Sequence, residues 1–521
     1  MDTNVLIVGA GPTGLMLANQ LARRGVSATI IDRHSGPAQQ SRAMAVQSRT
    51  LEIYSKMGLA GTALALGVRA GAANMWANGR WTARIPVGDI GKDLSPFPFI
   101  LMLGQDDNER IMGARLNELG VDIQWNTELI GFEQRPGHVE ATIRKPDGST
   151  ARINAAWVAG CDGSRSAVRE MSGITFPGEP YEQTFFVADT EATGAMKPAE
   201  LNVYLWEDGF HLFFPMRSQD RWRVIGILPK GLRQRDHLTF EEVVPAIRQE
   251  AGAALDFKSC AWFSVYRIYH RAAKRFRDRR CFLLGDAAHV HSPAGAQGMN
   301  TGLQDAYNLA WKLALVAKGQ ADPSLLDSYE AERLPVAKRL LETTDRAFQI
   351  IVSEGWFGRL FRTQILARVA AFAMTIRWVR RLAFRTISQI GIRYPESPLS
   401  ETAARLPTGA PVAGDRFPWM WVKFLGGAAP EDLFGALDDT RFNLIVIGQT
   451  PPLQEALGLG DLCSIHVIAA DPINAGELAR ARIAQPSFYL LRPDGHVGLC
   501  GTTFDAAALR RYVTDHLRLA F

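Results

Sequence analysis

Residues 5–14 read VLIVGAGPTG, and this stretch decides the fold of the chain. Four consecutive apolar residues lead into a glycine-rich turn, which is typical of a strand buried on both faces of a parallel sheet. Apolar residues then recur at helical spacing from Thr13 to Arg24, and Gly25 ends that helix. Val26 to Ile31 supplies a second strand. This order predicts a βαβ unit and an α/β fold of the Rossmann type.

The glycines of this turn have the spacing of a dinucleotide site. Gly9 permits a tight turn, Gly11 lets the backbone approach a pyrophosphate, and Gly14 lets the helix pack on the sheet. Backbone N–H groups and the positive end of the helix dipole then hold the phosphates. Asp32 ends the second strand, where a carboxylate accepts hydrogen bonds from ribose hydroxyls. The alternative, a purely structural glycine turn, leaves this acid unexplained.

A Gly-Asp turn lies far along the chain, in LGDAAHVHSPAGAQGMN at residues 284–300. Asp286 follows an apolar strand, where a carboxylate can accept the hydroxyl hydrogens of a sugar-alcohol chain, and the small residues after Pro293 leave room for a flat ring. Gly298 to Asn300 precede a helical run, whose N–H groups and dipole would stabilise negative charge on a reduced ring. A ligand that needs both this turn and the first one is FAD rather than a nicotinamide alone.

A further Asp-Gly turn stands in CDGSRS at residues 161–166, after an apolar strand. It has two interpretations. It is a β-turn ahead of a helix, or Asp162 orients backbone around a cofactor while Arg165 or Arg169 meets a phosphate. Elsewhere His289 and His291 lack a third ligand at a suitable spacing, so we predict no metal site.

Composition limits the other classes of function. A chain of 521 residues should hold more than one domain, and a net charge of +5 is too small to indicate nucleic-acid binding. The five cysteines form no C-x-x-C pair and no disulfide framework, which favours a reducing cytoplasm. We expect neither a signal peptide nor a transmembrane segment, because no apolar run is long enough.

Residues 355–394 carry eight arginines and neither Asp nor Glu, so the rest of the chain has a net charge of −3. We predict that this arm is mostly helical. One interpretation is an arm that packs its apolar face on the body and extends its arginines into water. The other is a surface for anionic lipid or a partner subunit.

The three turns in this order resemble the group A flavoprotein aromatic hydroxylases, the superfamily of para-hydroxybenzoate hydroxylase and phenol hydroxylase. Ser41-Arg42-Ala43 and Gln105 with Glu109-Arg110 resemble further elements of that family. The resemblance covers about residues 1–400. The C-terminal part is similar to the thioredoxin-like domain of the phenol and polyketide hydroxylase branches, including RPDG at residues 492–495, but without C-x-x-C we expect no thiol–disulfide exchange.

The resemblance implies a division into domains. Residues 1–176 and 272–400 form a discontinuous, Rossmann-like FAD-binding domain, of which 70–105 contribute to the substrate side. An antiparallel β-sheet domain for the substrate is inserted at 177–271, and a thioredoxin-like domain follows at 401–521. We leave a homodimer open.

It also implies the reaction and its cofactors. NADPH or NADH reduces FAD transiently, dioxygen adds to the reduced flavin, and the resulting flavin hydroperoxide hydroxylates an aromatic ring. The implied cofactor contacts are Gly9, Gly11, Pro12, Thr13, Gly14, Asp32, Arg33, Arg42, Gln105, Asp162, Gly163, Gly285, Asp286, Pro293, Gly298, Met299 and Asn300.

The substrate contacts are less specified by the sequence. Because the flavin carries the chemistry, we name no catalytic side chain. Tyr204, Trp206, His211 and Phe213 alternate on two neighbouring predicted strands and are candidates for an apolar pocket, with packing in the core as the alternative. Their bulk favours an apolar, flat substrate. No clear carboxylate-binding arginine stands among these strands, although Arg221 and Arg223 flank Trp222, and we therefore favour a phenol or a polycyclic polyketide over a small benzoate.

Two other functions remain open at this point. A Baeyer–Villiger oxygenase on the same scaffold would share every motif and differ in its product, a lactone instead of a hydroxylated ring. A non-catalytic flavin-binding scaffold would not need the ring-side segment at residues 284–300. A flavin halogenase is disfavoured because Trp419-Met420-Trp421 does not continue as the Trp-x-Trp-x-Ile-Pro element requires.

Overall fold

The computed structural model describes residues 1–38, 43–207, 209–218, 220–233, 235, 237–252, 254–291, 296–352 and 365–519. The predicted βαβ unit opens the chain, and its parallel strands lie at the centre of the first sheet, in the order β17-β18-β11-β1-β2-β8, with the β9–β10 hairpin extending β11. The elements are β1 (Thr3–Val8), α1 (Pro12–Arg23), β2 (Ala28–Ile31), β8 (Ile123–Gln124), β9 (Glu128–Arg135), β10 (His138–Arg144), β11 (Thr150–Gly160), α5 (Ala167–Met171), β17 (Arg277–Asp278) and β18 (Cys281–Leu283).

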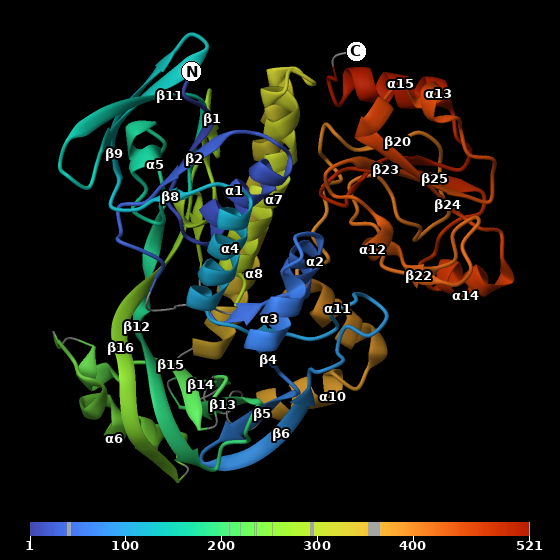
Figure 1. Cartoon of the computed structure of the whole chain (residues 1–521). Coiled ribbons are helices and arrows are strands. Elements are labelled where there is room, and N and C mark those ends of the chain that lie inside the picture. Colours follow the sequence, from blue (N-terminus) through green and yellow to red (C-terminus); the bar gives the residue numbers. More distant parts are fainter. Residues whose placement is uncertain are drawn as a thin grey trace.

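A second eight-stranded sheet has the order β19-β16-β12-β15-β14-β13-β5-β6. Its two long strands β12 and β16 run from the first domain into the lower part of the molecule (Figure 1). The segment at residues 70–105 adds β5 and β6 to this sheet. The elements are β5 (Ala72–Ala77), β6 (Arg80–Pro86), β12 (Gly178–Gly194), β13 (Leu201–Trp206), β14 (Gly209–Pro215), β15 (Arg221–Ile227), α6 (Phe240–Ala251), β16 (Leu255–Ala272) and β19 (His289–Val290).

Helices join the two sheets. The helix α7 is buried along most of its length and packs against α1, and α8 runs beside it through the middle of the molecule (Figure 1). A small sheet, β3-β7-β4, lies between the helices and the second sheet. The elements are β3 (Ala45–Val46), α2 (Ser48–Lys56), α3 (Ala60–Leu66), β4 (Val68–Arg69), β7 (Leu101–Met102), α4 (Gln105–Glu118), η2 (Gly285–Ala287), α7 (Gly298–Ala317), η3 (Pro323–Leu326) and α8 (Asp327–Val352).

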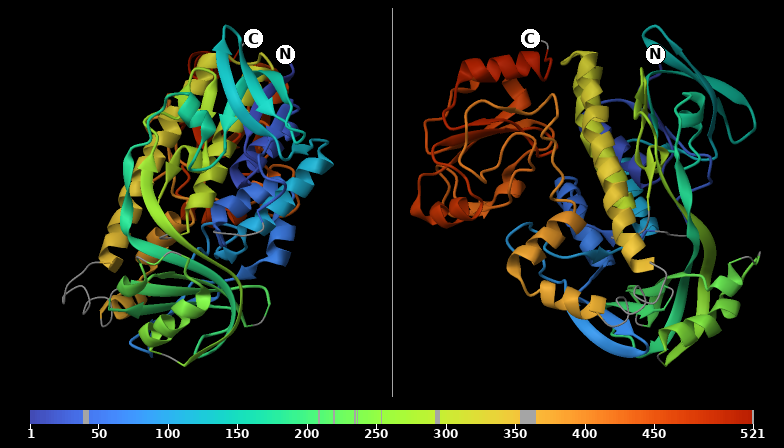
Figure 2. Two further views of the ribbon diagram at one scale, coloured as in Figure 1. Left: turned by 90° about the vertical axis from the view of Figure 1, so that its left-hand side faces the viewer. Right: turned by 180° about the vertical axis from the view of Figure 1, so that it is seen from behind.

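The C-terminal domain lies on the opposite side of α8 from the β9–β11 strands (Figure 2). Its sheet has the order β20-β26-β25-β23-β24, with β23 parallel to β24 and antiparallel to β25. The thioredoxin-like identity of this domain stays a prediction. The elements are β20 (Glu401–Thr402), β21 (Trp421–Val422), β22 (Glu431–Asp432), α12 (Leu433–Ala436), β23 (Phe442–Ile447), α13 (Gln454–Leu457), β24 (Cys463–Ile468), α14 (Pro472–Arg480), β25 (Ser487–Leu491), β26 (Val497–Gly501) and α15 (Ala506–Asp515).

The arginine-rich arm contains two helices within the described residues, α10 (Leu366–Ala373) and α11 (Arg377–Ile387). One face of α10 packs on the second sheet, beside β6. Among the described residues, no helix has both the length and the apolar character that crossing a membrane requires.

Candidate cofactor and substrate site

Close contacts within the protein require glycine at two of the three glycine positions in the first turn. Gly9 has a φ of +104°, and a Cβ there would stand 2.4 Å from the carbonyl oxygen of Cys161. A Cβ on Gly14 would stand 1.9 Å from the carbonyl oxygen of Gly9. A Cβ on Gly11 would meet no described atom within 4 Å. The chain therefore gives no steric reason for Gly11, and the space beside it fits a group that is not part of the protein.

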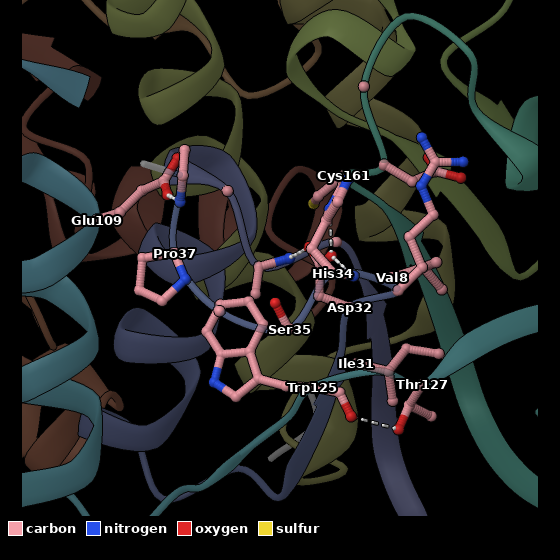
Figure 3. Close-up of a pocket in the computed structure, with 18 of the residues that line it drawn as sticks. Val8, Ile31, Asp32, His34, Ser35, Pro37, Glu109, Trp125, Thr127 and Cys161 are labelled. Atoms are coloured by element: carbon pink, nitrogen blue, oxygen red, sulfur yellow. Dashed lines mark hydrogen bonds and ion pairs between the residues drawn. The ribbon is translucent and has the colours of Figure 1, made fainter. Parts of the chain in front are cut away.

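A cavity of about 880 Å³ opens beside this turn (Figure 3). Asp32, Glu109, Trp125 and Cys161 line it from four separate segments of the chain. The Oδ2 atom of Asp32 accepts a hydrogen bond from the Ala10 N–H at 2.7 Å, so the acid also fixes the glycine turn. Predicted contacts that line the cavity are Gly9, Gly11, Asp32, Arg33, Gln105, Asp162 and Gly163.

The far Gly-Asp turn packs directly on the start of α1. Gly285 has a φ of +58°, and a Cβ there would stand 2.6 Å from Thr13 Oγ1. A Cβ on Gly302 of α7 would stand 2.5 Å from the same oxygen. Thr13 thus occupies a niche that two glycines from distant parts of the sequence leave open. Asp286 is exposed, between its buried neighbours Gly285 and Ala287.

Asp305, on α7, holds the Gly-Asp turn in place. Its buried carboxylate accepts hydrogen bonds from the Gly285 N–H at 3.0 Å and from Arg333 Nε at 2.6 Å, and it lies 2.7 Å from His289 Nε2. Burial would raise the pKa of Asp305, but Arg333 and His289 outweigh it and hold the pKa below its usual range. Sequence reasoning assigned Asp305 no role, because its partner Arg333 belongs to another helix.

At the Asp-Gly turn, only one of the two candidate phosphate arginines lines the cavity. Arg165 does so. Arg169 is buried and donates hydrogen bonds to the carbonyl oxygens of Ala287 at 3.0 Å and of Ser164 at 2.9 Å. A phosphate role for Arg169 is therefore wrong: this guanidinium ties the two Asp turns together. Burial raises the pKa of Asp162, whose Oδ2 accepts a hydrogen bond from the Val168 N–H at 3.1 Å.

The ring-side residues form the first turn of α7, which begins at Gly298 rather than after it. The Asn300 amide is fully buried: it accepts hydrogen bonds from the Gln47 N–H at 2.9 Å and the Thr50 hydroxyl at 2.8 Å, and it donates one to the Ala45 carbonyl at 2.9 Å. Its side chain is thus occupied in joining α7 to β3 and α2. Arg42 and Pro293 lie outside the described residues.

The aromatic residues predicted as substrate contacts lie on the face of the second sheet that α6 covers. Tyr204 and Phe213 are buried in the cluster that the sheet forms with α6, and Trp206 stacks on His211, whose Nε2 lies 2.8 Å from Glu250 of α6. These contacts are those of packing, the alternative that the alternating pattern leaves open, and the substrate role of the four residues stays a prediction. Alternation shows which residues share a face but not which face the helix α6 covers.

The opposite face of the sheet turns toward the small sheet and the start of α7. Phe214 and Ile225 pack there with Met44, Ala45 and Met102, and Leu212 remains partly exposed. This face also carries a buried ion pair. Arg223 donates to both carboxylate oxygens of Asp189 at 2.6 Å, and its Nη1 atom is buried with no hydrogen-bond partner among the described residues.

The fold and the site thus define a class of protein: an α/β protein with a dinucleotide-type glycine turn, a second Gly-Asp turn packed on it, and a second sheet with an apolar face. The chain matches the family model described as "FAD binding domain" over residues 2–344. It is 37% identical to 6-methylpretetramide 4-monooxygenase of Streptomyces rimosus, over 95% of this chain and 90% of that protein. It is 34% identical to pentachlorophenol 4-monooxygenase of Sphingobium chlorophenolicum, over 88% and 83%.

A solved structure agrees with these relatives. The anhydrotetracycline hydroxylase OxyS of Streptomyces rimosus superposes with a TM-score of 0.80 at 28% identity, over 99% of each chain. The chain therefore belongs to the group A FAD-dependent aromatic hydroxylases, and the predicted α/β fold, FAD cofactor and monooxygenase class are confirmed.

Proposed function

We propose that this enzyme uses NADPH or NADH and dioxygen to hydroxylate a phenolic or polycyclic, polyketide-like ring. The observation that supports this most directly is the niche of Thr13. There the phosphate-binding turn, the Gly285 turn and α7 meet, and Ala296, just before α7, packs on the apolar face of the second sheet. An extended FAD along these turns would bring its ring to that face.

The residues around the cavity fit the adenosine and pyrophosphate parts of FAD. The space beside Gly11 and the N-terminus of α1, which has no side-chain cap, suit the pyrophosphate. Asp32 suits the ribose, and the Trp125 indole, which sequence reasoning missed, suits the adenine. Asp286 suits the ribityl hydroxyls. When bound, FAD supplies electron transfer from a nicotinamide and the activation of dioxygen.

The chain's own task near the ring is to exclude water and orient the substrate. The apolar contact of Phe214 and Ile225 with Met44 and Met102 keeps this region dry, which limits the loss of activated oxygen to solvent. The first turn of α7 directs backbone N–H groups toward the same region, where they can stabilise negative charge. Asn300 orients that turn through its buried amide.

The paired state of Arg223 supports a phenol or a keto–enol ring over a benzoate. Asp189 already neutralises the guanidinium, so the remaining donor, Nη1, suits a neutral or weakly charged oxygen better than a carboxylate. The names of the two relatives, which act on 6-methylpretetramide and on pentachlorophenol, agree with this class. We further propose a cytoplasmic location, because all five cysteines are free.

Anaerobic reduction followed by product analysis tests the proposal. Adding NADPH or NADH to the yellow holoenzyme should bleach the flavin, and faster when a phenol or polyketide ring is present. Reoxidation with labelled dioxygen should place one labelled oxygen on the ring. A lactone would instead indicate the Baeyer–Villiger alternative. If no ring led to bleaching, the protein would be a non-catalytic flavin-binding scaffold. Light scattering of the same sample would test for a homodimer.

A further inference from the structure

The helices of the arginine-rich arm expose a set of large apolar side chains. On α10 and the residue before it these follow one helical stripe, and on α11 they are four residues apart. Their exposed fractions are high for residues of this kind. The apolar residues, with their exposed fractions, are Ile365 (38%), Val369 (53%), Phe372 (70%), Trp378 (67%) and Leu382 (58%). We call these residues, together with the arginines around them, the arm patch.

Arginines surround these apolar side chains. Within the described residues, none of the five guanidinium groups on α10 and α11 forms an ion pair. Burial lowers the pKa of Arg381; the nearby charges of Arg480 and Arg377 lower it further, and Asp93 offsets part of their effect. The five are Arg368, Arg377, Arg380, Arg381 and Arg385.

The positive charge of the arm patch distinguishes between the kinds of molecule that could bind to it. A second copy of the chain docked through the same patch would set these arginines against their counterparts, and like charges in contact oppose association. The chain's own core does not cover the patch, because the buried residues Ala367 and Phe384 already fix the inner faces of the two helices. The occupant must offer both negative charge and an apolar interior.

We propose that the arm patch binds the surface of a bilayer containing anionic phospholipids, with Trp378, Leu382 and Phe372 entering the headgroup boundary and the arginines meeting the phosphates. The two helices lie on the outside of the molecule, and α10 lies next to β6 (Figure 2). The contact is peripheral, since the helices are short and none of the described ones can cross a membrane.

The inner face of α10 gives this contact a consequence for the substrate. Leu366, Ala367 and Ala371 pack on the face of the second sheet that carries Leu212 and Tyr266, the face we propose for the substrate. A bilayer bound to the outer face therefore lies one helix away from that side of the sheet. Resting on the proposed function, this arrangement suits an apolar ring that is dissolved in lipid.

Flotation of the holoenzyme with lipid vesicles tests the proposal. We expect the enzyme to float with phosphatidylcholine vesicles that contain about a third phosphatidylglycerol, but not with pure phosphatidylcholine. Replacing two exposed arginines, as in Arg377→Gln/Arg385→Gln, should weaken binding about 25-fold, since each contributes about five-fold. Trp378→Ser/Leu382→Ser should weaken it by about ten-fold or more. Raising the salt concentration should reverse binding.

Matched controls separate the patch from general charge and hydrophobicity. Arg135→Gln/Arg144→Gln removes two exposed arginines at the β9–β10 hairpin, and Leu453→Ser removes a leucine that is 75% exposed. Both controls should float like the natural chain. All variants should keep FAD and turn over a water-soluble phenol, so failure of the proposed function would appear separately.

Three results would overturn the proposal. One is equal flotation of patch and control variants, or no flotation with anionic vesicles. Another is binding that depends on Arg377 and Arg385 but not on Trp378 and Leu382, which would indicate a site for an acidic protein or polyanion. The last is self-association in analytical ultracentrifugation that the Trp378→Ser/Leu382→Ser variant abolishes, which would assign the patch to a second copy.

Discussion

Arg492 Nη1 lies 2.5 Å from Glu332 Oε1, and both side chains are fully buried although they come from different domains. Arg492 stands in the turn between β25 and β26, and Glu332 stands on α8. Lys312 of α7 donates to the same carboxylate at 2.7 Å. The next residue of α8, Arg333, holds Asp305 and through it the Gly285 turn. Buried charges thus join the C-terminal domain to the helices that carry the flavin-side turn.

Removing Arg492 should therefore lower the free energy of unfolding by more than the loss of a surface ion pair would. Arg492→Met leaves Glu332 and Asp494 buried without their main partner, which should cost about 3–5 kcal/mol of the free energy of unfolding. Arg441→Met is a suitable control in the same domain, because its exposed ion pair with Asp438 is worth less than about 1 kcal/mol. Thermal unfolding of the two variants should differ clearly; equal midpoints would contradict a role for the buried pair.

The same cluster predicts acid sensitivity. Burial would raise the pKa of Glu332, but Arg492 and Lys312 lower it from 4.5 to about 2. The folded-state pKa is depressed, so this stabilisation is present above about pH 4.5 and is lost as the pH falls toward 2, because the unfolded chain takes up the proton first. Urea unfolding between pH 5 and 3 should show a steep loss of stability. Glu332→Gln, though less stable at neutral pH, should show a shallower slope; an unchanged slope would disprove the assignment.

Two glycine substitutions should separate folding from cofactor binding. Gly11→Ala adds a methyl group where nothing described lies within 4 Å, so the apoprotein should keep its stability to within about 0.5 kcal/mol while FAD affinity falls at least ten-fold. Gly14→Ala places the methyl group 1.9 Å from the Gly9 carbonyl oxygen and should destabilise the apoprotein itself. Fluorescence titration with FAD and thermal unfolding measure the two effects. A Gly11→Ala variant with normal FAD affinity would place the pyrophosphate elsewhere.

Asp286 offers an independent check on the ring-side half of the site. Asp286 is an exposed residue, so Asp286→Ala should change the free energy of unfolding of the apoprotein by less than about 1 kcal/mol. If the carboxylate accepts ribityl hydroxyls, the purified variant should retain less of its yellow cofactor and should reduce it more slowly. Glu118→Ala, which removes an exposed acid from the far end of α4, is the matched control and should retain the cofactor normally.

The parts of the site that the sequence could predict are local in the chain. The glycine turn, the acid that follows it and the Asp-Gly turns each carry their physical reason within a few neighbouring residues. The contact between Thr13 and Gly285 is predictable from the sequence only through the inference that one FAD binds to both turns. The structure supplies the contact itself, through a niche made by Gly285 and Gly302.

The errors have a common physical cause, since each depends on a partner that is distant in sequence. Arg169 has helical spacing from an Asp-Gly turn, but its hydrogen bond goes to Ala287. Tyr204 and His211 share one face as their alternation predicts, but α6 decides that this face is buried, and the strand pattern does not predict where that helix packs. Pattern alone does not identify the packing neighbour that determines the direction of a side chain.

The choice between a phenolic and a carboxylate-bearing substrate can be tested through the Asp189–Arg223 pair. Asp189→Asn keeps the shape of the acceptor but removes its charge, so the Arg223 guanidinium on the α7-facing side of the sheet gains an uncompensated positive charge. We expect the variant to bind ring carboxylates about ten-fold more tightly, as one added charge-assisted hydrogen bond of roughly 1.5 kcal/mol implies, while binding of neutral phenols changes little.

Glu191→Gln removes the same charge from the next acid of β12, which faces the exposed Arg221 across the same two strands at 3.5 Å. This control should leave the preference unchanged. Flavin-reduction rates measured over a range of phenol and benzoate concentrations compare the two variants. An equal preference in both would mean that Arg223 does not face the substrate, and the proposed exclusion of benzoates would lose its support.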